Sequence, residues 1–247
     1  LSMFHTLFNV INVALLIWFV PQIASVVTKM VKPSEEEKED EEYTLEYFST
    51  GVQPVPEIAI IEAKKEVIKM SEMINKMLNY FGETFRNKKN IESALLKARK
   101  FETKSDQMQE QISSYLAECT KHELSLESSK GASAMMRLTN ELESVGDSSL
   151  NLFLQIERLE HDLKFDNEMD SQVLELHGVV MEFIDWNHSF IINNIDSMTS
   201  QDLEKSIEYE NKIDDMRNDL LDSSSERLSN GSNPKAELLF MDIVKHL

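Results

Sequence analysis

The chain has 247 residues, of which 41% are hydrophobic, and it carries a formal net charge of −19. This charge argues against nucleic-acid binding, and the single cysteine, Cys119, excludes disulfide scaffolds and cysteine zinc sites. With only 6 glycines and 5 prolines, the chain can form long uninterrupted helices and has the length for one or two domains.

The first segment, residues 1–31, is predicted to be a transmembrane helix. Its run 7–28 is mostly apolar and contains no acidic residue, and about 20 such residues span a bilayer. Lys29 and Lys32 follow the run and predict a cytoplasmic C-terminal flank. Polar Asn9 in such a span indicates that the helix packs against other membrane helices, because a polar side chain facing lipid is costly. We therefore expect this chain to be the C-terminal part of a longer membrane protein. A signal peptide and a buried soluble helix are the alternatives.

An acidic linker is predicted at residues 32–56, followed by a helical domain at 57–247. The linker contains the run "SEEEKEDEE", which is typical of a solvated tether. From Ile60 to Phe81, and again from Met135 to Leu163, apolar residues recur every three or four positions, which indicates long packed helices. No part of this domain has the pattern of a strand, so the predicted class is all-α. The expected helices are 57–83, 88–121, 129–165, 170–197, 200–228 and 234 to the end.

An internal repeat is indicated by two similar segments. Residues 101–112 ("FETKSDQMQEQI") and 209–220 ("YENKIDDMRNDL") share four of twelve residues at an offset of 108. "MRLTNEL" and, 105 residues later, "MDIVKHL" extend the likeness. These patterns predict two three-helix repeats, at about 57–165 and 170–247, with the second one truncated at Leu247.

Acidic pairs four residues apart are the candidate metal ligands, because such residues lie on one helix face. The pair Glu210 and Asp214 interrupts a predicted apolar stripe that includes Leu203 and Ile207. Carboxylates buried in such a stripe need a cation or a basic partner. Facing carboxylates in a bundle suit Mg, Ca, Mn or iron. The alternative is that the acids are merely solvated. The candidates are Glu102, Asp106, Glu143, Asp147, Glu210 and Asp214.

Catalytic motifs are missing from the sequence. There is no Ser–His–Asp order, no nucleophile elbow and no phosphate-cradling glycine loop. The six histidines show no ligand spacing. We therefore expect no enzyme activity, no catalytic residue and no cofactor-binding residue.

Two stretches carry a family resemblance. "FHTLFNVINVALLIWFVP" (4–21) resembles the HxLFN helix that ends a repeat in bacterial sodium/phosphate cotransporters of the NptA and type II Na/Pi group. "EIAIIEAKKEVIKMSEMINKML" (57–78), followed by the acid-pair helices, is similar to the PhoU-like domain that bacterial members often carry after their last transmembrane helix. The resemblance covers nearly the whole chain.

The resemblance implies a sodium-dependent phosphate transporter of the bacterial inner (plasma) membrane, with residues after about 31 in the cytoplasm as a regulatory domain. It implies that the six acids bind divalent or ferric ions (Fe, Mn, Mg or Zn). The expected partners are membrane lipid, upstream transporter helices, sodium and phosphate through the full-length protein, and a second copy in a homodimer, but no nucleic acid. Ser144 stands where the family has Arg, and a fourth acid pair would follow Leu247. A membrane-anchored metal-binding regulator without transport activity and a structural helical interaction protein are the alternative functions.

Overall fold

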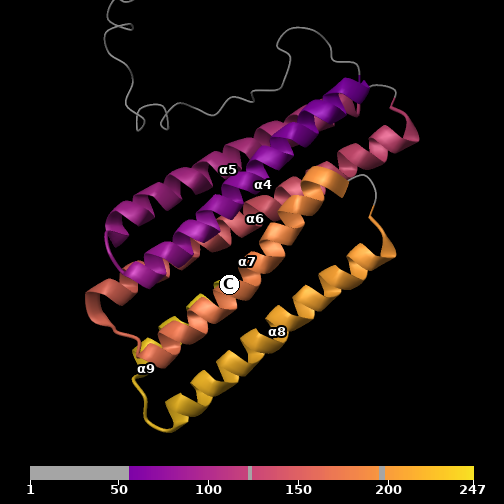
Figure 1. Ribbon diagram of the computed structural model, residues 1–247. Helices are drawn as coiled ribbons and strands as arrows, with labels where there is room; N and C mark the ends of the chain where they lie inside the picture. Colours follow the sequence, from indigo (N-terminus) through magenta and orange to yellow (C-terminus); the bar gives the residue numbers. More distant parts are fainter. Residues whose placement is uncertain (1–55, 122–123, 195–197) are drawn as a thin grey trace, which may run out of the picture. The chain divides into compact units, whose positions relative to one another are not determined.

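The computed structural model describes residues 56–121, 124–194 and 198–247 (Figure 1). The predicted transmembrane segment 1–31, and all but the last residue of the predicted linker 32–56, lie outside these ranges. Within them the chain forms six α-helices and no strand, which confirms the all-α class. The helices are α4 (Pro56–Asn87), α5 (Ile91–Cys119), α6 (Leu126–Asp162), α7 (Asn167–Asn194), α8 (Ser200–Ser229) and α9 (Pro234–His246).

The helix boundaries follow capping chemistry. The Ser125 hydroxyl accepts a hydrogen bond from the Ser128 amide at the start of α6. Thr199 and Asp202 form a reciprocal capping box at the start of α8. Asn233 caps α9 and Pro234 occupies its first turn, as the sequence predicts. All six predicted helices therefore exist, with ends displaced by a few residues.

The helices α4, α5 and α6 pack against one another around an apolar core. The positions from Ala63 to Phe81 that recur every three or four residues are buried in α4, as predicted. The predicted seam of α6 is buried or half-buried from Met135 to Leu159, and Leu163, directly after the helix, is half-buried. α5 buries nine residues along its length, so all three helices contribute to this core.

The helices α7, α8 and α9 also contact one another, but α8 lies along one edge and buries little (Figure 1). Among its residues only Leu220 and Ser224 are buried, whereas Leu203 and Ile207 are 51% and 46% exposed. The prediction that these two belong to a packed apolar stripe is therefore wrong. In the first half of α8, the Tyr209 ring stacks on Phe183 of α7 at 5.3 Å between centroids.

The turn between α8 and α9 is fastened by an ionic contact. Glu237 of α9 is 2% exposed and accepts two hydrogen bonds from the Arg227 guanidinium, at 2.9 and 3.0 Å. The Ser224 hydroxyl donates to the same carboxylate at 2.6 Å. Both carboxylate oxygens are therefore satisfied, as a buried charge requires.

A seam between α4 and α7 joins the first three helices to the last three. The Ser71 hydroxyl and the His188 ring lie 3.0 Å apart, and Asn75 donates to Asp185 at 2.6 Å. His177 is buried against Gly82, where an added Cβ would lie only 2.4 Å from the imidazole Cε1 atom. Its Nε2–H donates to the Leu78 carbonyl at 2.9 Å. Glycine at position 82 is therefore what allows the ring to enter the seam.

None of the helices within the described ranges combines the length and the apolar character needed to cross a membrane. The assignment of 57–165 and 170–247 as sequence repeats stays a prediction.

Candidate metal centre

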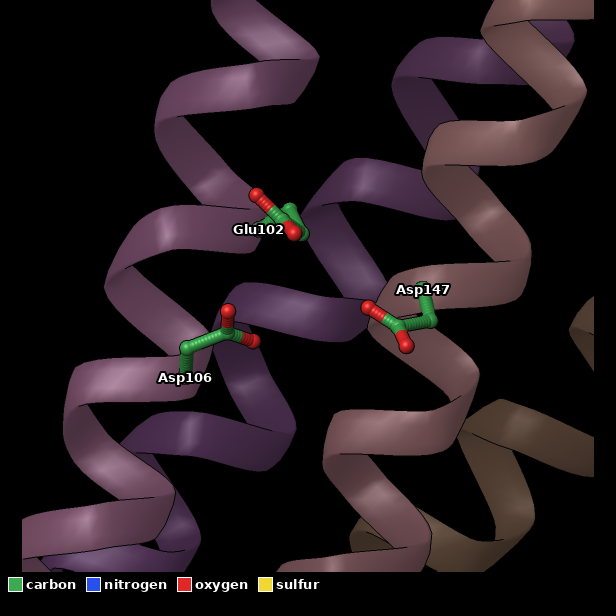
Figure 2. A group of neighbouring side chains, drawn as sticks. All are labelled: Glu102, Asp106 and Asp147. Carbon is green, nitrogen blue, oxygen red and sulfur yellow. The ribbon is translucent and has the colours of Figure 1, made fainter.

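Three of the predicted ligands meet where α5 lies beside α6. Carboxylate oxygens of Glu102, Asp106 and Asp147 lie within 4.8 Å of one another, with the first two on α5 and the third on α6 (Figure 2). Glu143 stands one turn before Asp147 on α6 and is half-buried. We call these four residues the acid quartet.

The spacing of the acids explains their convergence. Glu102 and Asp106 are four residues apart, as are Glu143 and Asp147, so each pair occupies one face of its helix. α5 and α6 are in extensive contact. Their acidic faces border that contact, so the two pairs oppose each other across it.

Three members of the quartet have raised pKa values. Partial burial, followed by the Asp106 and Asp147 carboxylates, raises the pKa of Glu102, although a hydrogen bond from the Thr103 hydroxyl opposes this change. Burial and Asp147 raise the pKa of Asp106. Burial, Asp147 and Asp106 raise the pKa of Glu143. Burial is the largest cause in all three cases, and repulsion by neighbouring carboxylates adds to it, so a bound cation would relieve the second part.

The remaining two predicted ligands lie elsewhere. Glu210 and Asp214 are exposed on α8 and border a cavity of about 530 Å³ that Ser144 of α6 and Lys245 of α9 also line. Asp214 forms an ion pair with Arg217 at 2.7 Å. The structure therefore brings three of the six candidates together, with Glu143 one helical turn away, and places the α8 pair apart from them, with a basic partner for one of its members.

The chemistry of the quartet suits hard cations. All four side chains offer carboxylate oxygens, which Mg²⁺, Mn²⁺ and iron accept readily. Among the described residues, the group that could hold a metal contains no histidine and no cysteine. Zn²⁺, which favours nitrogen and sulfur ligands, fits this donor set less well.

A comparison of the sequence with protein-family models identifies a domain that includes these acids. Residues 67–156 match the family described as "PhoU: PhoU domain". This segment is PhoU-like. All four members of the acid quartet lie inside the match, and PhoU domains are linked to phosphate homeostasis. No significant match to a curated protein or to a solved structure accompanies it.

Two small residues in the PhoU-like segment escape analysis of charge patterns. Ser105 of α5 and Gly146 of α6 are buried between the acids, where the helices touch. A Cβ added at Gly146 would lie 2.9 Å from the Ser105 Oγ atom. The only signal in the sequence is a glycine in the interior of a long helix, immediately before Asp147, because a conformationally costly residue there needs a packing reason.

Proposed function

We propose that this chain is the C-terminal part of a sodium-dependent phosphate transporter of the bacterial inner membrane. Residues 1–31 form its last membrane-spanning helix in this proposal. The PhoU-like bundle after the linker is a cytoplasmic regulatory domain that binds a divalent or ferric cation at the acid quartet. Glu210 and Asp214 are not part of that centre.

The main support for this proposal is that the segment matching the PhoU family includes the acid quartet. The PhoU-like segment 67–156 contains α5, most of α6 and all four acids, and PhoU domains are linked to phosphate homeostasis. The likeness of residues 4–21 to a cotransporter helix adds a membrane context that is independent of the bundle.

The regulatory role follows from the position of the charges between two packed helices. Four carboxylates on α5 and α6 repel one another in the absence of a cation. A bound cation supplies positive charge that the carboxylates share, and the packing of α5 on α6 then depends on cation binding. A phosphate-linked change in available cation would thereby reach the core of the first three helices.

A metal titration tests the centre. The bundle from residue 56 to Leu247 is titrated with Mn²⁺, Mg²⁺ or Fe²⁺ while the melting temperature is followed. A ligand that binds only the folded protein must raise that temperature. We expect a rise that the variant Asp106→Asn/Asp147→Asn loses. No rise with any of these metals would overturn the assignment of the quartet as a metal centre.

The transport role is tested in cells. The gene sequence upstream of Leu1 should encode further transmembrane helices, and the full-length protein should support sodium-dependent phosphate uptake. Asp106→Asn/Asp147→Asn in the full-length protein should change how uptake responds to external phosphate. A start codon near Leu1, or uptake indifferent to sodium, would contradict the transporter assignment and favour a membrane-anchored regulator.

A further inference from the structure

The contact between Ser105 and Gly146 lies directly beneath the acid quartet. Ser105 falls between Glu102 and Asp106 on α5, and Gly146 directly precedes Asp147 on α6. Ser105 is fully buried and Gly146 is buried. This is therefore a place where the two helices approach closely through small side chains.

A side chain at Gly146 would crowd two side chains of the neighbouring helices, so one of them would have to shift. An added Cβ would lie 2.9 Å from the Ser105 Oγ atom and 3.1 Å from the Cδ1 atom of Ile74 on α4. Its distance to the Ser105 Cβ atom would be 3.7 Å, which is an ordinary contact. The Ser105 hydroxyl is held in place because it donates to the Glu102 carbonyl at 2.9 Å. The obstruction is therefore the Oγ atom on one side and a core isoleucine on the other.

We propose that Gly146 is a positioning residue for the acid quartet. By omitting a side chain opposite Ser105, it sets the separation of α5 and α6 at which the carboxylates of Asp106 and Asp147 come within reach of a single ion. The value of this spacing for cation binding rests on the function proposed above, whereas the spacing itself does not. Carboxylates have to be held to within about 0.5 Å of a working geometry, so a small change in helix separation matters.

The first test measures the spacing without metal. Asp106→Cys/Asp147→Cys, in a Cys119→Ala background, places two thiols across the contact, and their oxidation to a disulfide depends steeply on geometry. We expect the disulfide to form more slowly once Gly146→Ala is added. Gly178→Ala is the matched control, because a Cβ at that helical glycine meets no atom within 4 Å. Equal oxidation rates with and without Gly146→Ala would overturn the proposal.

The second test measures Mn²⁺ affinity from the metal-dependent rise in melting temperature. Gly146→Ala should weaken binding by about tenfold or more, which is the scale of damage at residues that support metal ligands. Adding Ser105→Ala should restore much of the affinity, because it removes the Oγ atom and leaves the 3.7 Å contact. Ile112→Val, a buried change elsewhere on α5, controls for lost stability and should leave the affinity near wild type. Unchanged affinity in Gly146→Ala, or equal weakening in Ile112→Val, would contradict a positioning role.

The two tests separate the two proposals. If the wild-type bundle binds no Mn²⁺ but Gly146→Ala slows the thiol oxidation, the spacing role stands and the metal function falls. If the wild type binds Mn²⁺ and Gly146→Ala changes neither measurement, the metal function stands and the spacing role falls.

Discussion

The helices α5 and α8 carry the same acid spacing in opposite surroundings. α5 buries nine residues and places Glu102 and Asp106 against an acidic face of α6. α8 buries two residues, and its pair is exposed, with Asp214 bound to Arg217. Two carboxylates four residues apart therefore define only a helix face. A metal centre also needs a second helix that presents acids to that face.

The largest expected difference between the two helices is in stability. Leu116 of α5 is fully buried, so Leu116→Ala should lower the free energy of unfolding by about 2–5 kcal/mol. Leu203 of α8 is 51% exposed, so Leu203→Ala should change that free energy by no more than about 0.5 kcal/mol. Urea denaturation of both variants measures this. Similar losses would mean that the first half of α8 is covered in solution.

Metal binding gives the next difference. At a Mn²⁺ concentration of 100 times the Kd, binding should stabilise the wild-type bundle by about 2.7 kcal/mol. Glu210→Gln/Asp214→Asn should keep this stabilisation, because the α8 pair lies outside the quartet. Glu102→Gln/Asp106→Asn should abolish it. Calorimetric melting with and without Mn²⁺ distinguishes the cases, and loss of the effect in the α8 variant would restore its acids as ligands.

The pH dependence of the seam between the two groups of helices is a third measure. Burial and the Arg86 charge lower the pKa of His177 from its ordinary value of 6.5, although its hydrogen bond to the Leu78 carbonyl opposes this change. The neutral ring is therefore the form that the fold favours. Its contribution is complete above pH 6.5 and is lost as the pH falls from 6.5 through the lower pKa of the folded state.

Denaturation as a function of pH tests this expectation. His177→Gln, whose amide can still donate to the Leu78 carbonyl, should flatten the loss of stability below pH 6.5. His246→Gln at the end of α9 is the control, because it removes a histidine that lies outside the seam. A profile unchanged by His177→Gln would show that other groups cause the acid sensitivity.

The smallest expected effects are changes in stability when acidic charges are removed in the absence of metal. Glu102→Gln/Asp106→Asn removes repulsion on α5 and should raise the free energy of unfolding by about 0.5 kcal/mol. Asp214→Asn breaks the exposed pair with Arg217 and should lower it by about 0.2–0.5 kcal/mol. Denaturant melts in the presence of a chelator measure both variants. The same sign for both would mean that the two acid pairs share one environment after all.

The helices were predictable because the chain has few breakers and a strong apolar period. The period from Ile60 to Phe81 identifies a face of α4 that is buried, and Asn233 with Pro234 marks the start of α9. These are local signals, and the structure confirms them.

The stripe on α8 was not predictable in the same way. Leu203 and Ile207 have helical spacing, yet a period specifies a face and not the neighbour that covers it. The composition of α8 was the warning, because its charged residues outnumber its apolar ones. The sequence identified the four acids as candidate ligands, but it did not show which of them lie together. Their grouping depends on how closely α5 approaches α6 at Ser105 and Gly146, and these two residues carry no charge.

The contact of Arg227 and Ser224 with Glu237 means that the two halves of α8 are attached to the bundle with different strength. The C-terminal half is fixed at the turn, whereas the N-terminal half rests on α7 through few side chains. The rate of amide hydrogen exchange should therefore fall along α8, from fast near Ser200 to slow near Leu220, because local opening starts at the N-terminal end of the helix.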